Sequence, residues 1–410
     1  MRKLAGLFTV ACLAAASPAF ATNGMRMIGF GPAQNAMGGV GVGATLDASS
    51  VASNPAGIVD LGTRLDVGIG YFRPAVSHQA TGTPTGAPPP NPPSMIAADG
   101  ATVDSDRGGS PIPAIAYVRP VTDRLSAGLG VFAVSGMGVD YPSNVYLSKA
   151  LTSYLNARFA PGVAYRVNDV LSVGVALNTM MAQMEYDVAA AAGQVKHDTA
   201  TAFGAGATVG VKAKVTETIA LGAAYETRSW FQDFSFDVPG GKDELAFDQP
   251  QVVTLGASVR PTALLLLAAD VQWIGWSETM GKRQPEYSKS QPTSMPFDMS
   301  WKDQWVLKLG AQVTPVKGLD VRAGWDFGAM PLDRDRAFEN LVFPAVAEHH
   351  FTLGAGYAVA DRITVSVAGM YSPEAKISGA NPGPAPGQMI DAYTTKMSQF
   401  QIDAGASWRF

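Results

Sequence analysis

The side chains that could perform covalent or metal chemistry are few and scattered along the chain. The histidines are His78, His197, His349 and His350, and the single cysteine is Cys12. Nucleophilic catalysis needs a base beside the nucleophile, and no spacing of serine, histidine and aspartate suggests such a set. The adjacent pair His349-His350 fits a polar rim better than a metal site. The sequence therefore predicts no enzyme, no metal site and no cofactor.

A glycine run at residues 39–43 (GVGVG) superficially matches a dinucleotide-binding loop. Such a loop requires a preceding strand and a following helix. Here a leader-like segment precedes the run and a polar coil follows it, so we expect no dinucleotide site. The net charge of −4 comes without a basic stripe, and nucleic acid is therefore not an expected partner.

The first 21 residues have the pattern of a secretory signal peptide. Arg2 and Lys3 form a basic start, an apolar run covers residues 4–16, and a small-residue cleavage motif ends at Ala21. The run is too short for a spanning helix, which needs about 20 apolar residues. Cys12 lies inside this leader in a poor lipobox. We therefore expect cleavage after Ala21 and a mature chain without cysteine or disulfide.

The composition argues against a soluble protein. Charged residues make up 16% of the chain, against roughly 25% in soluble proteins. No apolar stretch reaches the ~18 residues expected of a spanning helix. A chain this apolar without a spanning helix has either a large core or a closed barrel that faces lipid.

A period-two pattern of side chains runs through the chain and is clearest at the C-terminus. Between Gln399 and Phe410, apolar residues alternate with polar or small ones. Successive side chains of a strand point to opposite faces, so the pattern indicates strands with one apolar face. Similar alternation covers residues 171–178, 304–313, 319–327 and 351–359.

These patterns predict an all-β fold, a 14-stranded antiparallel transmembrane barrel. A soluble β-sandwich is the alternative, but its strands usually have about five or six residues, and most of these are longer. Short turns also alternate strictly with long loops, which is typical of outer-membrane barrels. An even number of strands lets the first pair with the last and removes free edges. The predicted strands are 63–76, 111–121, 123–136, 152–167, 169–188, 198–214, 216–236, 246–260, 263–279, 300–315, 317–330, 345–360, 361–374 and 396–410.

Aromatic residues near the predicted strand ends indicate an interfacial girdle. These residues are Tyr71, Phe72, Tyr165, Trp273, Trp276, Trp301 and Trp408. The terminal Phe410 fits a signal read by the barrel-assembly machinery, which we expect as a partner. A buried aromatic end is the alternative explanation of Phe410.

Residues 22–62, between the leader and the first predicted strand, show no strand alternation. They are small, glycine-rich and weakly charged. Such a segment cannot form a core of its own, but it can coil inside a barrel whose polar inner wall satisfies its backbone. The predicted organisation is a signal peptide at 1–21, a plug at 22–62 and a barrel at 63–410.

Motifs in this plug make the chain resemble the FadL family (OmpP1/FadL/TodX) of outer-membrane transporters. The plug motifs are Gly38-Gly39-Val40-Gly41, Asp47-Ala48 and Asn54-Pro55-Ala56-Gly57. Later segments also look like the family, namely 273–277 (WIGWS), 301–303 (WKD) and Pro331 after 325–327 (WDF). The resemblance covers essentially the whole mature chain.

The resemblance implies a transporter of the long-chain fatty-acid type in the outer membrane of a Gram-negative bacterium. In the family the plug is called the hatch, and a hydrophobic ligand moves from external loops to a pocket beside it. Movement of the hatch N-terminus and a kink in the third strand open a lateral gap toward the bilayer. The implied partners are a hydrophobic small molecule, outer-membrane lipid and lipopolysaccharide, and the implied state is a monomer.

The resemblance also implies three groups of site residues. Glycines inside a strand mark a bulge or bend, which places the kink and lateral gap at Ser135, Gly136, Met137 and Gly138. The hatch motif is Asn54, Pro55 and Ala56, and we expect the Asn54 amide to hydrogen-bond the freed backbone of the third strand. The implied hydrophobic pocket comprises Met25, Met27, Ile28, Phe30, Met181, Met184, Val188 and Phe297.

The ligand class stays open at this stage. Fatty-acid members hold the carboxylate with basic side chains near the outer ends of the fifth and tenth strands, which here correspond to Val188 and Phe297. Burying an unpaired carboxylate is costly. Either another cation serves, or the ligand is an uncharged monoaromatic or aliphatic hydrocarbon, as in relatives that import such compounds. The candidate cations are Arg26, Lys196, Arg228 and Lys302.

Two further classes compete with a hatch-closed transporter. A general diffusion porin would need an open, charged lumen and typically about sixteen strands, and the plug argues against it. A surface receptor or adhesin could use the proline-rich loop at 81–93, although that composition also suits a plain solvated loop.

Overall fold

The computed structural model describes residues 22–81, 100–142, 150–190, 193–238, 241–281, 299–337, 340–382 and 389–410. The predicted signal peptide, most of the proline-rich loop and Phe297 lie outside the described residues. No helix in the described ranges is long and apolar enough to cross a membrane.

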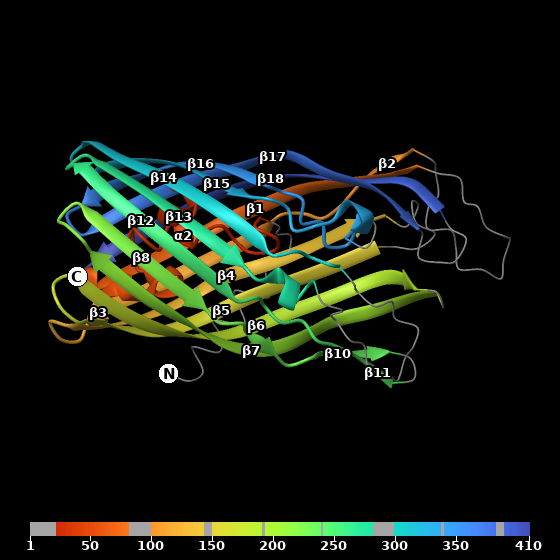
Figure 1. Ribbon diagram of the computed structural model, residues 1–410, viewed down its shortest axis with the longest axis horizontal. Coiled ribbons are helices and arrows are strands. Elements are labelled where there is room, and N and C mark those ends of the chain that lie inside the picture. Colours follow the sequence, from red (N-terminus) through yellow and green to blue (C-terminus); the bar gives the residue numbers. More distant parts are fainter. Residues whose placement is uncertain are drawn as a thin grey trace.

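The strands form one antiparallel sheet that closes on itself, because the last strand pairs with the first from Arg64↔Arg409 to Thr81↔Ala392. Of its 16 strands, β2 (Thr102–Asp104) and β9 (Trp230–Phe231) are short additions, and the other fourteen form the wall (Figure 1). The wall strands are β1 (Arg64–Thr81), β3 (Ser110–Pro120), β4 (Leu125–Tyr141), β5 (Ala150–Arg166), β6 (Leu171–Ala190), β7 (Gly193–Lys214), β8 (Ile219–Glu226), β12 (Val252–Thr262), β13 (Leu265–Ile274), β14 (Gln304–Val316), β15 (Leu319–Gly328), β16 (His349–Ala360), β17 (Ile363–Pro382) and β18 (Met389–Arg409). The predicted 14-stranded barrel is confirmed.

The largest departure from the predicted strands is at 216–236. The wall strand β8 ends at Glu226, and the chain then forms a separate two-stranded hairpin from β10 (Phe234–Val238) and β11 (Gly241–Leu245). Phe234 and Phe236 of this hairpin are buried. An alternating sequence pattern indicates that a strand has one apolar face. It does not indicate whether that face contacts lipid or the protein interior.

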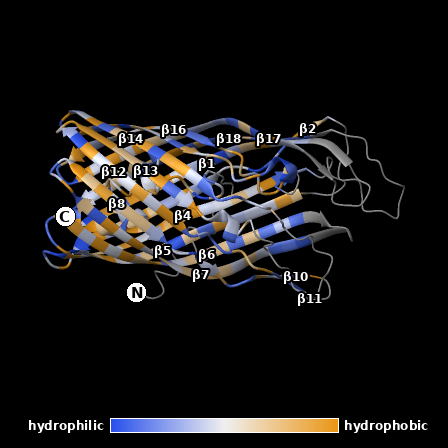
Figure 2. Cartoon of the chain, viewed as in Figure 1, coloured by the Kyte–Doolittle hydropathy of each residue, from blue (hydrophilic) through white to orange (hydrophobic). Residues whose placement is uncertain are grey.

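The outer wall is apolar toward the end of the barrel that carries the short turns (Figure 2). Large apolar side chains such as Ile69, Leu255 and Leu353 are at least 60% exposed there, as a lipid-facing wall requires. The predicted aromatic girdle was partly wrong. Tyr71 is exposed, whereas its neighbour Phe72 is fully buried, because adjacent residues of a strand face opposite sides. Trp276 and Trp301 are buried as well.

The hatch coils inside the barrel near the short-turn end, where Figure 1 shows it in red and orange. It contains the short helices α2 (Gly31–Asn35), α3 (Ser50–Ser53) and η1 (Pro55–Asp60). Gly38 has a φ of +66°, and a Cβ on it would lie 2.7 Å from the Leu309 carbonyl oxygen. Glycine at this position therefore lets the hatch backbone lie directly against the wall.

Two inserts fill the outer half of the lumen with apolar side chains. One is the β10–β11 hairpin with the following Phe247, and the other is the connection between β15 and β16, which contains η3 (Arg334–Arg336) and Phe343. The rings of Phe247 and Phe343 meet at 6.0 Å between centroids. The Thr152 hydroxyl of β5 donates to the Val342 carbonyl at 2.6 Å and ties the second insert across the lumen. A further short helix, η2 (Trp276–Glu278), follows β13.

Candidate lateral opening and hatch contacts

The strand β4 loses one of its two neighbours between Phe132 and Asp140, where the Asp106 N–H again donates to the Asp140 carbonyl at 2.8 Å. Its described pairing with β3 runs from Ser126 to Phe132, while its pairing with β5 continues to Tyr141. The β4–β5 register shifts between Ala133 and Ser135, as at a β-bulge. From Phe132 to Val139 every residue of β4 is buried, so this part of the strand no longer has a lipid-exposed face.

The hatch covers the edge of β4 that β3 leaves. Arg26 forms an antiparallel bridge with Ser135. The Met27 N–H donates to the Val134 carbonyl at 3.1 Å, and the Gly136 N–H donates to the Met25 carbonyl at 3.0 Å. Unpaired backbone groups are costly inside a membrane. The short hatch strand therefore supplies hydrogen-bond partners for backbone groups of β4 that β3 does not pair.

The residues predicted for the kink lie at this interruption. Ser135 follows the register shift, Gly136 pairs with the hatch, and Met137 belongs to the apolar cluster of the outer lumen. A Cβ on Gly138 would lie 2.3 Å from the Thr152 carbonyl oxygen. The tight approach of β4 to β5 therefore requires glycine at Gly138.

Asn54 occupies a different place from the one predicted. Its amide nitrogen donates to the carbonyls of Val42 and Val211 at 3.0 and 3.1 Å, and its oxygen accepts from the Ala56 N–H at 3.2 Å. The expected bond to the third strand is wrong, because Val211 lies in β7. Asn54 instead caps η1, whose first residues are Pro55 and Ala56, and fixes the end of the hatch to β7, three strands from β4 along the wall.

The residues predicted for the hydrophobic pocket do not form one group. Met25 and Met184 belong to the outer apolar cluster, whereas Met27 and Ile28 pack with Phe72, Ile112, Ala133, Leu155 and Met370 around the interruption. Met181 packs at the edge of this second cluster, and Phe30 at a third one against β4. Met180 and Met184 are buried with the even-numbered residues of β6, so Met181 lies on the other face. Val188 pairs with Val195 through the backbone, and Phe297 lies outside the described residues.

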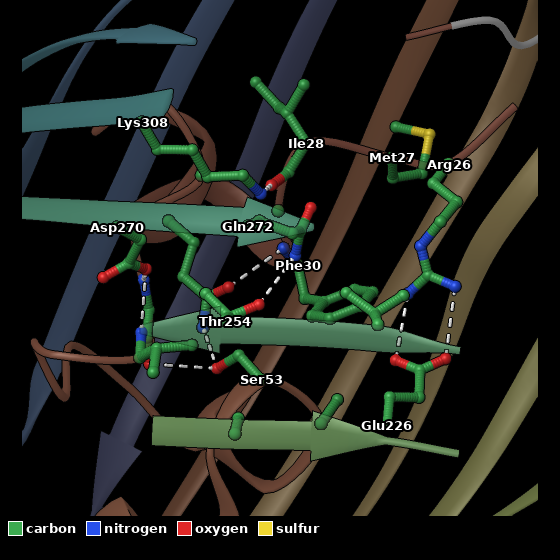
Figure 3. A pocket seen from close by; sticks show the side chains of 18 of the residues that line it. Arg26, Met27, Ile28, Phe30, Ser53, Glu226, Thr254, Asp270, Gln272 and Lys308 are labelled. Atoms are coloured by element: carbon green, nitrogen blue, oxygen red, sulfur yellow. Dashed lines mark hydrogen bonds and ion pairs between the residues drawn. The ribbon is translucent and has the colours of Figure 1, made fainter. Parts of the chain in front are cut away.

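A buried group of three charged side chains joins the hatch to the wall. The Arg26 guanidinium donates to both oxygens of Glu226, at 3.2 and 2.9 Å (Figure 3). The Arg158 Nη2 donates to the same carboxylate, and the Arg158 guanidinium lies 6.0 Å from the centre of the Phe30 ring. Among the described residues, Nε and Nη1 of Arg158 have no hydrogen-bond partner.

Two more charged wall residues hold the hatch backbone. Asp270 accepts from the N–H groups of Gly41, Val42 and Gly43 at 2.8 to 3.2 Å, and Lys308 donates to the Ile28 carbonyl at 2.6 Å (Figure 3). The glycine run at 39–43 thus cradles a carboxylate of the protein itself. A cavity of about 50 Å³ lies between these residues and is also lined by Glu226, Thr208 and Thr254.

Sequence reasoning missed Arg158, Glu226, Asp270 and Lys308. The signal was present, because each is a charged residue in a predicted strand, and charges on a lipid-facing wall are destabilising. All four are therefore expected on the inward face, and the structure buries them there. Which of them meet across the lumen depends on the curvature and stagger of the barrel.

The cations proposed from sequence already have carboxylate partners. Arg26 pairs with Glu226, Lys196 with Asp198, Arg228 with Asp248, and Lys302 with Asp333. The side chains of Lys196 and Lys302 are more than 60% exposed. Neither exposed lysine is therefore placed to bind a ligand inside the lumen.

A lipid-facing barrel stoppered by its own N-terminal segment, with an interrupted wall beside that segment, defines a hatch-closed outer-membrane transport channel. The chain belongs to the outer membrane protein transport protein family (OMPP1/FadL/TodX), whose model matches residues 8–406. It is therefore a transporter of hydrophobic compounds in the Gram-negative outer membrane and a transport channel rather than an enzyme.

Solved structures show the same fold over nearly the whole chain. A FadL homologue from Pseudomonas aeruginosa has a TM-score of 0.77 and 16% identity, covering 94% of this chain and 100% of its own. The toluene transporter TodX of Pseudomonas putida has a TM-score of 0.73 and 18% identity, covering 93% and 99%. The toluene transporter TbuX of Ralstonia pickettii has a TM-score of 0.68 and 19% identity, covering 93% and 98%. No curated protein sequence matches the chain.

Proposed function

We propose that this channel takes up long-chain fatty acids and releases them sideways into the outer membrane between β3 and β4. The observation that carries the proposal is the outer part of β4, where the hatch strand at Met25–Met27 replaces β3 as the neighbour. Two hatch–wall backbone hydrogen bonds close this interval, and they can break without disturbing the β4–β5 pairing. An apolar ligand that leaves here keeps its chain out of water.

The buried charges bear on the choice of ligand class. Arg26 and Arg158 share the single carboxylate of Glu226, so this group has one positive charge in excess. Buried charges are stable only when they are paired and hydrogen-bonded. A fatty-acid carboxylate would supply the missing negative charge and accept from the two Arg158 N–H groups that have no partner among the described residues. These features support a carboxylate ligand.

Uptake of uncharged monoaromatic or aliphatic hydrocarbons is the second candidate function. The outer lumen is lined by Tyr154, Phe247 and Phe343 within one apolar cluster, and these rings suit an aromatic ligand. The similar structures TodX and TbuX are described as toluene transporters. A hydrocarbon would use the same lateral route and leave the charged group as it stands.

A disulfide across the hatch and β4 tests the lateral route. Arg26 and Ser135 form a pair flanked by the two backbone hydrogen bonds, for which the Cα atoms lie about 4.5 Å apart. This spacing suits a disulfide. The double variant Arg26→Cys/Ser135→Cys should carry no ligand when oxidised and should regain the uptake of the two single variants after reduction. Measurable uptake that is equal in both redox states would exclude the route.

Uptake of labelled oleate and of labelled toluene then decides the ligand class, together with mass spectrometry of compounds that co-purify with the detergent-extracted protein. Oleate uptake with co-purified fatty acid supports the first function. Toluene uptake without oleate uptake supports the second. A steady ionic current in a planar bilayer would instead indicate an open porin.

We further propose that residues 1–21 direct export and are removed, that residues 22–62 act as the hatch, and that the channel works as a monomer. Phe410 ends the chain beside β1, where its N–H donates to the Thr63 carbonyl at 3.0 Å, and its side chain is exposed. This exposure supports recognition of the C-terminus by the barrel-assembly machinery. A measured mass of the mature protein that corresponds to a chain starting at Thr22 would verify the cleavage site.

A further inference from the structure

Glu226 is a wall carboxylate that binds one arginine of the hatch and one arginine of the wall. It is the last residue of β8, and its two oxygens accept from Arg26 of the hatch. One of these oxygens also accepts from Arg158 of β5. In this structure Glu226 occupies the position between the two guanidinium groups.

The Arg26 side chain and backbone tie the hatch to different strands. The guanidinium binds β8 through Glu226, and the backbone of the same residue bridges to Ser135 of β4. Phe30, a few residues further along, lies under Arg158 and packs against Phe132 with ring centroids 5.1 Å apart. Loss of the Arg26–Glu226 pair would therefore weaken the hatch segment at the strand that it closes.

The adjoining cavity offers a place for Glu226 when it leaves the arginines. It has a volume of about 50 Å³ and is lined by Glu226 and by the hydroxyl-bearing Thr208 and Thr254. Thr208 lies directly across from Glu226 in the β7–β8 pairing. A volume of this size holds a few water molecules, each needing roughly 10–15 Å³. A displaced carboxylate would thus meet hydroxyl groups, water and the Lys308 side chain in a cavity that the Asp270 carboxylate also lines.

We propose that Glu226 is an internal substitute for the ligand carboxylate and that its exchange for the ligand unlatches the hatch. This inference rests on the proposed fatty-acid function. In the empty channel Glu226 bridges Arg26 and Arg158 and fixes the hatch to the wall. The ligand carboxylate takes this bridging position, Glu226 turns into the cavity, and Arg26 is then bound to a mobile ligand instead of to β8. A hydrophobic ligand without a carboxylate cannot make the exchange.

The test measures how fast a water-soluble thiol reagent reaches the hatch. Met25→Cys places a thiol at a hatch residue that is fully buried, in a chain whose only cysteine lies in the predicted leader. We expect oleate to raise the labelling rate by roughly tenfold, within the range of typical couplings between two sites. Oleyl alcohol, which has the same chain without the carboxylate, should leave the rate unchanged.

Adding Glu226→Gln should make labelling fast without ligand and insensitive to oleate, because the neutral amide cannot hold Arg26 as a carboxylate does. Asp326→Asn is the matched control. Asp326 is also a buried wall carboxylate that accepts from the hatch, through Asn23 at 3.0 Å, but it does not bind Arg26 or Arg158. This control should keep its response to oleate. Heat-dependent gel mobility reports whether each variant forms a folded barrel.

Three results would overturn the latch. They are an equal response to oleyl alcohol and oleate, slow and oleate-sensitive labelling in the Glu226→Gln variant, and loss of the oleate response in the Asp326→Asn variant alone. Oleate uptake by the unsubstituted channel is measured beside them. If uptake is normal, these results reject only the latch. If the unsubstituted channel neither binds nor carries oleate, the fatty-acid function fails and the carboxylate exchange fails with it.

Discussion

The inner and outer halves of the lumen are closed by different kinds of contact. In the inner half, charged wall residues hold the hatch backbone at defined atoms, as Asp270 does with three N–H groups and Lys308 with the Ile28 carbonyl. In the outer half, Phe234, Phe247 and Phe343 close the lumen mainly through apolar packing. Hydrogen bonds fix positions because they are directional, whereas hydrophobic contact is not directional.

The two kinds of contact respond differently to a bound ligand. An apolar ligand can replace apolar side chains of the outer half at little cost, since one hydrophobic contact is exchanged for another. The apolar chain of a ligand cannot replace the charged contacts of the inner half, where unpaired groups would remain. On the lateral route that we propose, the outer half is therefore suited to receive the ligand, and the inner half to stop it and turn it toward the wall.

Removing the N-terminal part of the hatch that contacts β4 should have the largest effect. Deletion of residues 25–31 removes Met27 and Ile28 from the cluster around the interruption, and Arg26 from the pair with Glu226. We expect uptake to be abolished while the barrel still assembles, since no wall strand is altered. Uptake of labelled oleate and toluene measures the effect, and unchanged uptake would refute the hatch mechanism.

Loss of the Asp270 carboxylate tests the directional contacts of the inner half. In Asp270→Ala, three backbone N–H groups lose a charged acceptor, and such hydrogen bonds contribute about 1.5–3 kcal/mol each. The hatch should loosen, seen as lower thermal stability and measurable ion conductance in a planar bilayer. The exposed external Asp237 gives a control, Asp237→Ala, which should behave like the parent. A closed, equally stable Asp270→Ala channel would contradict the comparison.

Truncation of an aromatic ring tests the apolar outer half. Phe247 packs against Tyr154 and Phe343 at centroid distances of 4.7 and 6.0 Å. Phe247→Ala should cost about 3 kcal/mol of stability and lower uptake at limiting ligand about tenfold, the effect of ~1.4 kcal/mol in binding. It should not raise conductance, because the hatch stays bound. The control is Phe203→Ala, which removes an exposed ring on the lipid-facing side. This variant should take up ligand like the parent.

The smallest expected effect concerns pH at the periplasmic end of the hatch. Burial and the nearby Asp66 raise the pKa of Asp47 to about 6, against the opposing effect of Arg64. The docked hatch therefore retains this proton up to a higher pH than an undocked chain with a pKa of 3.8. The protonated Asp47 therefore stabilises the docked hatch. This stabilisation is fully present below pH 3.8 and is lost as the pH rises through about 6.

Asp47→Asn should flatten this dependence, because the amide does not titrate and can still accept from the Ser49 N–H. Thermal unfolding measured across the same pH interval is the readout. A parent and variant with parallel pH profiles would show that Asp47 does not titrate with hatch docking. Asp361→Asn, in the exposed turn between β16 and β17, supplies the control at a carboxylate outside the hatch.

The sequence alone determined the barrel and the place of the hatch. Alternation over residues 399–410 and in the other strands indicates which side chains share a face, and the fourteen-stranded wall follows from it. The same rule required Arg158, Glu226, Asp270 and Lys308 to face inward. The glycines of β4 indicated a break in the third strand because they lie inside a strand pattern.

Only the tertiary structure decided which inward residues meet. Asn54 binds β7 rather than β4, Met181 faces away from Met184, and Phe234 turns into the lumen instead of toward lipid. Arg26 and Arg158 are separated by more than a hundred residues, yet both bind Glu226. The reason is geometric, because a period-two pattern fixes the face of each strand but not its stagger around the barrel. The stagger sets the partners across the lumen, and with them the charges that a ligand would meet.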